Sequence, residues 1–332
     1  MAAAPAAAFK PAVLFESSAI EESGFNRSAL NGAQAFSNQT GTDVAILAPQ
    51  DGVVASTDVT LRLTQDAIDA GHDPLVGIGS GFTDAFQALA PRNPDVHFVL
   101  IDSVVDGANV RSVIFREEEG SLLVGVIAAL VSETSTIAFV GSQDDPQIRS
   151  FGCGFVQGAR LINPNIVVRV GMVGDTPKAW YDPEKGAEIA NALMAEGADV
   201  VYHAAGGSGN GVIGAAAAAG KLAIGVDSNQ NGQAPGHVLT SMLKRLDVAV
   251  YLALSEIAEG RWTFGTRRLG LHDGGVDWAL DEHNIGLISQ IAHDRVDSIA
   301  FDVLAGRLEV ARYNPDTGCP GFDFDAALAA GP

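Results

Sequence analysis

Two aspartates stand at corresponding places in two similar stretches of this sequence. Asp102 lies in the string Leu100–Ser103, and Asp227 lies in Gly225–Ser228, 125 residues further along. Each follows an apolar run typical of a buried strand. An ionised carboxylate only accepts hydrogen bonds, so the pair suits the hydroxyl groups of a bound ligand. The same pair also suits acid–base chemistry, and capping of a nearby loop is the structural alternative.

Glycine-rich turns precede both aspartates, at Gly77–Gly81 and at Gly206–Gly209. The second continues into Gly209–Gly214, which fits the G-x-G-x-x-G fingerprint of dinucleotide-binding proteins and has Asp227 downstream. Taken alone, this pattern is the strongest sign of a nicotinamide-dependent dehydrogenase in the sequence. However, the fingerprint belongs at the first strand–helix turn of a nucleotide domain, and here it lies past the middle of the chain. We therefore interpret it as a tight turn whose backbone N–H groups, near Gly206, meet a ligand.

Aromatic and basic side chains mark two further places. Trp180 lies on a loop just before Asp182-Pro183, which is a good start for a helix, so we expect its indole to stack on a flat ligand. Phe25 lies in the matching loop of the first half, and either stacks likewise or packs beneath its loop. Lys244 follows an apolar string at the start of an expected amphipathic helix. We expect it to donate to a ligand oxygen, the alternative being a solvated charge.

The elements that must position these residues alternate between strands and helices, which predicts βαβ units and parallel sheets. A second pair of similar strings, Ala29–Ala33 and Phe155–Ala159, has nearly the same offset as the aspartates, which indicates two similar lobes. Ligands of parallel sheets sit beyond the carboxyl ends of the strands, so facing lobes would bring the candidate residues into one cleft. The expected strands are 12–15, 43–47, 75–78, 97–101, 136–140, 166–170, 199–202 and 222–226. The expected helices are 27–39, 59–70, 83–89, 120–131, 157–162, 183–195, 211–219 and 246–259.

Composition narrows the classes of function. The formal net charge of −20 repels a phosphate backbone, so we expect no nucleic-acid partner. We find no motif for a metal, a phosphate-binding P-loop or a hydrolytic nucleophile, and expect a non-catalytic protein. Cys153 and Cys319 match no metal-ligand spacing; buried unpaired thiols are the favoured interpretation, and a disulfide is the alternative in an oxidising compartment.

The first ten residues carry neither the basic start nor the apolar stretch of a signal peptide. Either the protein is cytosolic, or this is a mature form whose export signal has been replaced. The Ala/Pro-rich leader, residues 1–9, favours the second interpretation because a flexible tether before a folded domain has this composition.

Several strings resemble the basic membrane protein family, the substrate-binding proteins of ABC transporters that include nucleoside receptors. The similarity begins with Glu22–Asn26, which is like the family's D-K-S-F-N opening, and runs in family order to about Val310. The other matching strings are Glu118–Leu122, Asp182–Gly186, Ala204–Gly206, Gly225–Gln230 and Thr240–Arg245.

This resemblance implies an α/β protein with the type I periplasmic-binding-protein fold, in which two similar Rossmann-like lobes with parallel sheets are joined by a hinge. The lobes are expected to be discontinuous, with residues 10–128 and 246–282 in lobe 1 and residues 129–245 and 283–332 in lobe 2. The ligand would lie in the cleft between them.

The resemblance also implies a purine nucleoside as ligand and an ABC permease as partner. Phe25 and Trp180 would sandwich the base, while Asn26 and Glu22 address its edge. The ribose hydroxyls would be held by Asp102, Asp227 and Lys244, with a backbone N–H near Gly206. No cofactor is implied, and we expect a monomer that is periplasmic or lipid-anchored to the outer face of the cytoplasmic membrane.

Two positions depart from the family pattern, because Glu22 replaces an aspartate and Trp180 a more usual phenylalanine. The choice of base is therefore open, and a larger or different ring system is an alternative ligand. A receptor for a sugar or an autoinducer with the same fold, and a sensory protein that signals to a membrane kinase, are further alternatives.

Overall fold

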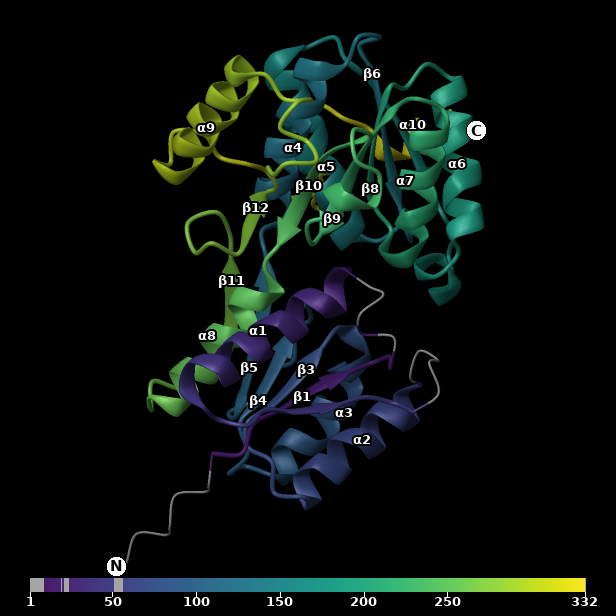
Figure 1. Cartoon of the computed structure of the whole chain (residues 1–332). Coiled ribbons are helices and arrows are strands. Elements are labelled where there is room, and N and C mark those ends of the chain that lie inside the picture. The colour runs from purple at the N-terminus through teal and green to yellow at the C-terminus, as the bar shows by residue number, and fades with distance from the viewer. Residues whose placement is uncertain (1–8, 19, 21–23, 51–55, 332) are drawn as a thin grey trace, which may run out of the picture. The chain divides into compact units, whose positions relative to one another are not determined.

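The computed structural model describes residues 9–18, 20, 24–50 and 56–331, and these form two α/β units (Figure 1). Unit 1 comprises the chain up to Phe115 together with Arg245–Leu269, and unit 2 comprises Arg116–Lys244 and Gly270–Pro332. The chain therefore passes from one unit to the other three times. The expected flexible leader, except Phe9, lies outside the described residues, and so does Glu22.

Unit 1 is built on a six-stranded sheet in which every neighbouring pair is parallel. The order is β11-β5-β4-β3-β1-β2, with the bounds β1 Ala12–Phe15, β2 Ala45–Leu47, β3 Leu75–Ile78, β4 Phe98–Ile101, β5 Val110–Phe115 and β11 Gly265–Leu269. Helices α1 (Gly24–Thr40) and α8 (Leu246–Ala258) cover one face, and α2 (Thr57–Asp69) and α3 (Thr83–Leu89) cover the other (Figure 1).

Unit 2 has a sheet of the same design, in the order β12-β10-β9-β8-β6-β7. Its strands are β6 Thr136–Gly141, β7 Val167–Met172, β8 Val200–Ala204, β9 Leu222–Asp227, β10 Val238–Lys244 and β12 Val276–Trp278, of which only β12 pairs antiparallel. Helices α4 (Glu117–Val131) and α5 (Pro146–Ile162) lie on one face, and α6 (Pro183–Ala195) and α7 (Gly209–Ala218) on the other. Helices α9 (Gln290–Leu304) and α10 (Phe324–Ala329) complete the unit.

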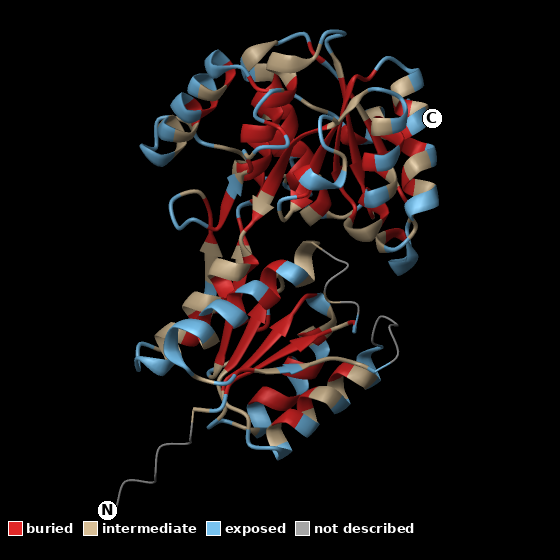
Figure 2. Ribbon diagram, in the orientation of Figure 1, coloured by how far each residue is buried: buried red, intermediate tan, exposed pale blue. Residues whose placement is uncertain are grey.

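The two sheets have the same strand order when β1 to β5 are matched with β6 to β10 and β11 with β12. This confirms the prediction of two similar α/β lobes with parallel sheets. In each unit the central strands are buried almost completely (Figure 2), as expected for parallel strands that helices cover on both faces.

The expected lobe boundaries and the observed units differ at two elements. Residues 116–128 and 270–282, expected in lobe 1, belong to unit 2. Helix α4 packs so closely on α5 that only glycine fits at two contact positions. A β-carbon at Gly125 would overlap the Phe155 backbone, and one at Gly158 would overlap the Leu122 backbone. Strand β12 pairs with β10.

The sequence prediction missed strands β5, β10, β11 and β12. It also placed Lys244 at the start of a helix, which was wrong. Lys244 is the last residue of β10, and α8 begins at Leu246. Polar residues inside these strands hid them. In β10, for example, the buried Thr240 hydroxyl donates to the Ala279 carbonyl and Ser241 donates to Asn231.

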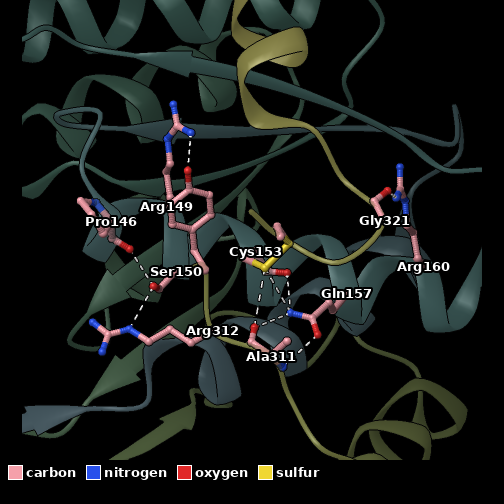
Figure 3. Close-up of a disulfide and its surroundings, with 11 residues drawn as sticks. Pro146, Arg149, Ser150, Cys153, Gln157, Arg160, Ala311, Arg312 and Gly321 are labelled. Carbon is pink, nitrogen blue, oxygen red and sulfur yellow. Dashed lines mark hydrogen bonds between the residues drawn. A yellow bond between two sulfur atoms is a disulfide. The ribbon is translucent and has the colours of Figure 1, made fainter. Parts of the chain in front are cut away.

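Cys153 and Cys319 form a disulfide, so the favoured prediction of unpaired thiols was wrong. The bond joins α5 to the C-terminal segment, 166 residues apart (Figure 3). Beside it, the Gln157 amide exchanges hydrogen bonds with the backbone of Ala311 at 2.7 and 3.0 Å, and Arg149 donates to the Tyr313 hydroxyl. The C-terminal segment is thus fixed to α5 along several turns. Within the described residues, none of the helices is both long and apolar enough to cross a bilayer.

Candidate functional site

Asp102 and Asp227 occupy equivalent positions in the two units, at the carboxyl ends of β4 and β9. Both adopt the left-handed backbone conformation, with φ angles of 69° and 67°. Aspartate enters this region at a cost in free energy, and such strain gathers at binding and catalytic sites. The same unusual conformation at both equivalent positions makes each strand end a candidate binding position in its own unit.

The glycine turns also correspond to each other. Gly79 (φ 93°) follows β3 and Gly206 (φ 54°) follows β8, and each leads through a short 3₁₀ turn into a helix, α3 or α7. Positive φ angles favour glycine, which explains its presence at both turns. Each turn lies next to an aspartate strand end, because β3 pairs with β4 and β8 with β9.

Glu16 lies near Asp102 in unit 1 and was missed by the sequence analysis. It follows β1, and its carboxylate accepts a 2.7 Å hydrogen bond from the Gly81 N–H. Burial raises the pKa of the Glu16 carboxyl, the Gly81 hydrogen bond lowers it, and the negative charge of Asp102 raises it further. Its position directly after the apolar run 12–15 was the signal that marked Asp102 and Asp227, and it applied here too.

Phe25 and Asn26 lie in the first turn of α1, and both are partly buried. Glu22, the third candidate in this stretch, is outside the described residues. The structure therefore places two of the expected base-contacting residues on one helix turn of unit 1.

In unit 2, Trp180 lies against Gly206. Trp180 ends a 3₁₀ turn, Pro177–Trp180, and its indole lies against Gly206, where a β-carbon would stand 3.0 Å from the indole Cε3. The indole Nε1 donates a 2.9 Å hydrogen bond to the Gln143 Oε1. Gln143 lies just beyond the end of β6 and was not anticipated from sequence.

Lys244 is buried, with 2% of its side chain exposed, and so is not the solvated charge considered as the alternative. Its ammonium lies 3.3 Å from the Glu117 carboxylate, which also accepts a 3.1 Å hydrogen bond from Gln147, and 5.5 Å from the centre of the Phe151 ring. Removing one partner of such a buried pair leaves an uncompensated charge, so Lys244 and Glu117 hold each other in place. Glu117 was also missed.

The loop after Asp227 is fixed by side-chain hydrogen bonds. The Gln230 side-chain oxygen accepts from the Val226 N–H at 2.8 Å, and Asn229 and Asn231 both donate to Asp281. These contacts hold the backbone on either side of Asp227, which supports its left-handed conformation.

Packing accounts for two of the three glycines of the G-x-G-x-x-G pattern in α7. A β-carbon at Gly209 would overlap the buried His203 ring, and one at Gly211 would overlap the Pro183 carbonyl. These two glycines thus have a structural cause, whereas a β-carbon at Gly214 would meet no atom within 4 Å.

Comparison with known proteins gives consistent matches. Residues 9–298 match the family described as ABC transporter substrate-binding protein, PnrA-like. The ABC transporter nucleoside-binding protein BmpA of Lactococcus lactis is 31% identical over 87% of each chain. An uncharacterized lipoprotein of Pyrococcus furiosus is 32% identical over 82% of this chain and 70% of its own. Among solved structures, ABC transporter solute-binding proteins of Aeropyrum pernix superpose with a TM-score of 0.78 at 25% identity, covering 96% of this chain and 95% of theirs.

Proposed function

The chain belongs to the PnrA-like family of ABC transporter substrate-binding proteins, and from this premise we propose that it captures a purine nucleoside for import. The proposal includes a membrane permease as its partner and no chemical change in the ligand. The fold supports it, because two α/β units with matched parallel sheets are the architecture of solute-binding proteins such as those of Aeropyrum pernix.

The pair of left-handed aspartates, one at the same strand end of each unit, is the observation that carries the proposal. Each carboxylate accepts hydrogen bonds, and a ribose offers hydroxyl donors. In the proposed complex Asp102, Asp227 and Lys244 hold the ribose, and a backbone N–H near Gly206 assists them. Because Glu117 fixes the Lys244 ammonium at 3.3 Å, that cation is oriented before the ligand arrives.

The base is assigned to the aromatic side chains. Trp180 and Phe25 stack on its two faces, while Asn26 and Glu22 contact its edge. Aromatic stacking contributes about 0.5–1.5 kcal/mol beyond the burial of area, and each charge-assisted hydrogen bond contributes about 1.5–3 kcal/mol. Micromolar binding needs a free energy of about 8 kcal/mol. Two aromatic contacts and two or three such bonds, together with the burial of apolar area, are enough to supply it.

We also propose that the protein acts outside the cytoplasm, in the periplasm or attached to the outer face of the membrane. The disulfide supports this, since structural disulfides persist in oxidising compartments. The name of the Pyrococcus relative, a lipoprotein, agrees with it. A ligand held by both units would favour the closed arrangement, which the permease would then recognise.

Calorimetric titration with guanosine, inosine and adenosine tests the function, with ribose and NAD as comparison ligands. We expect one-to-one binding of at least one purine nucleoside in the micromolar range or tighter, and no binding of NAD. Binding of ribose but of no nucleoside would identify a sugar receptor, and binding of NAD alone would refute the proposal. Mass spectrometry of the co-purifying small molecule provides an independent answer.

A further inference from the structure

Trp180 needs a hydrogen-bond acceptor that a phenylalanine at this position would not need. The indole N–H only donates, and the structure supplies the Gln143 side-chain oxygen at 2.9 Å. We propose that Gln143 is a specificity-determining residue, which fixes the plane of the Trp180 indole and offers its own amide N–H groups to an acceptor on the ligand's ring. This inference rests on the proposed function and refines it.

The donor role of the Gln143 amide follows from the chemistry of its partner. Because the indole can only donate, the oxygen of the amide must face it, and the NH₂ group must face away. Gln143 is partly exposed, whereas its neighbour Ser142 is fully buried, so the amide lies at the open side of the strand end. A ring stacked on the indole would have these two N–H donors at its rim.

The indole is held from other sides as well. Its benzo edge lies against Gly206, and the loop that carries it is tied to the glycine turn by Ser208. The Ser208 hydroxyl donates to the Ala179 carbonyl at 2.8 Å and accepts from the Asp182 N–H at 2.7 Å. The Gln143 hydrogen bond therefore fixes the remaining edge of the ring, so little conformational entropy is lost when a base stacks on it.

Two substitutions separate the two roles of Gln143. Gln143→Met removes both acceptor and donors at similar length, whereas Gln143→Glu keeps an acceptor for the indole and loses the donors. Affinities are measured for guanosine, 3-deazaguanosine and 7-deazaguanosine, which differ only in a ring acceptor. We expect wild type to lose about three- to tenfold in affinity for one deaza analogue, in line with one hydrogen bond, and both variants to lose this discrimination.

The state of the indole is measured without ligand, by ¹⁹F NMR of protein labelled with 5-fluorotryptophan. The chain has three tryptophans, and the Trp180 resonance is identified by its absence from Trp180→Phe. We expect this resonance to shift and broaden in Gln143→Met and to change less in Gln143→Glu. Gln157→Met serves as the matched control, because the Gln157 amide bonds to Ala311 near the disulfide; it is expected to lower the melting temperature without changing discrimination.

An unchanged Trp180 resonance in Gln143→Met, or unchanged discrimination between the analogues, overturns the inference. Failure of wild type to bind any nucleoside would instead refute the proposed function, and with it the contact of the Gln143 amide with the ligand's ring. The ¹⁹F spectrum would still decide whether Gln143 fixes the indole.

Discussion

Asp102 and Asp227 adopt a left-handed conformation, which restricts the substitutions that can test them. Alanine would add backbone strain to the loss of charge, whereas asparagine tolerates this region and keeps the shape of the side chain. We predict that Asp102→Asn and Asp227→Asn each weaken nucleoside binding about tenfold to a hundredfold, the loss of one charge-assisted hydrogen bond. Titration calorimetry measures this, with little change expected in melting temperature.

The control for both variants is Asp145→Asn, which alters an aspartate that caps α5 by accepting from the Gln147 and Ile148 N–H groups. It should change stability little, because asparagine caps a helix about as well as aspartate, and leave affinity unchanged. If both site aspartates hold the same ligand, the double variant will bind more weakly than either single one, still at one ligand per chain. An affinity that depends on only one of the two aspartates would contradict the shared site.

His203 gives a second prediction at this scale. The ring is fully buried, and burial lowers the pKa of His203 from 6.5 to about 4. The pKa of His203 is lower in the folded state than in the unfolded state. The contribution of the neutral, buried His203 ring to stability is therefore complete above pH 6.5 and is lost as the pH falls toward 4. The shift corresponds to a loss on the order of 3 kcal/mol in the free energy of unfolding.

Urea unfolding of wild type and His203→Gln between pH 7.5 and pH 4 measures this effect. Glutamine does not titrate, so the difference between the two proteins should diminish or reverse in sign as the pH falls. Parallel pH profiles would show that His203 does not take up a proton on unfolding in this range.

The candidate site residues identified from the sequence share local signals. Asp102 and Asp227 end apolar runs and repeat, and Trp180 precedes a helix start, so each could be recognised from its neighbours in the chain. Gln143 and Glu117 act through partners 37 and 127 positions away, Trp180 and Lys244, and no local pattern indicates such pairs.

At the scale of elements, we expect alanine substitutions at two glycines of α7 to change stability in opposite directions. A β-carbon at Gly209 would overlap the His203 ring, while one at Gly214 would meet no atom within 4 Å. We predict that Gly209→Ala lowers the free energy of unfolding by about 1–3 kcal/mol, because the ring must move. Gly214→Ala should raise it by about 0.5–1 kcal/mol, since alanine favours a helix interior.

Urea unfolding monitored by circular dichroism compares the two variants. Equal effects of both substitutions would contradict the packing explanation of the G-x-G-x-x-G pattern. A loss of stability in Gly214→Ala would show that this face of α7 is more crowded than the structure indicates.

The sequence predicted most elements because buried parallel strands form continuous apolar runs; β1, β3, α3 and α6 have the predicted bounds. The prediction failed in strands whose buried residues include polar side chains with hydrogen-bond partners elsewhere in the chain. In β5, the buried Arg111 interrupts the apolar pattern, and its guanidinium is paired with Glu256 and Thr263, more than 140 positions away. Helix α5 begins eleven residues before the predicted start, because its glycines serve close contact with α4.

At the scale of the whole chain, short repeated strings were enough to indicate two similar lobes, because duplicated strand ends keep the same residues. The exact boundaries depend on which helix packs on which, and that information lies in side-chain contacts such as those between α4 and α5. Cysteine pairing is equally non-local, since Cys153 and Cys319 are 166 positions apart.

The disulfide gives the prediction that belongs to this scale. Both cysteines belong to unit 2, and the bond closes a loop of 166 residues that includes the unit 1 segment Arg245–Leu269. Removing it increases the conformational freedom of the unfolded chain. We predict that the double variant Cys153→Ser, Cys319→Ser loses about 2–5 kcal/mol of stability, measured by urea unfolding. Treatment of wild type with dithiothreitol should reproduce the loss and leave the double variant unchanged. Nucleoside affinity in the absence of urea should be retained, because none of the candidate ligand-binding residues lies in the C-terminal segment that the bond secures. Should affinity fall together with stability, this segment would have to act on the binding site as well as on the fold of unit 2.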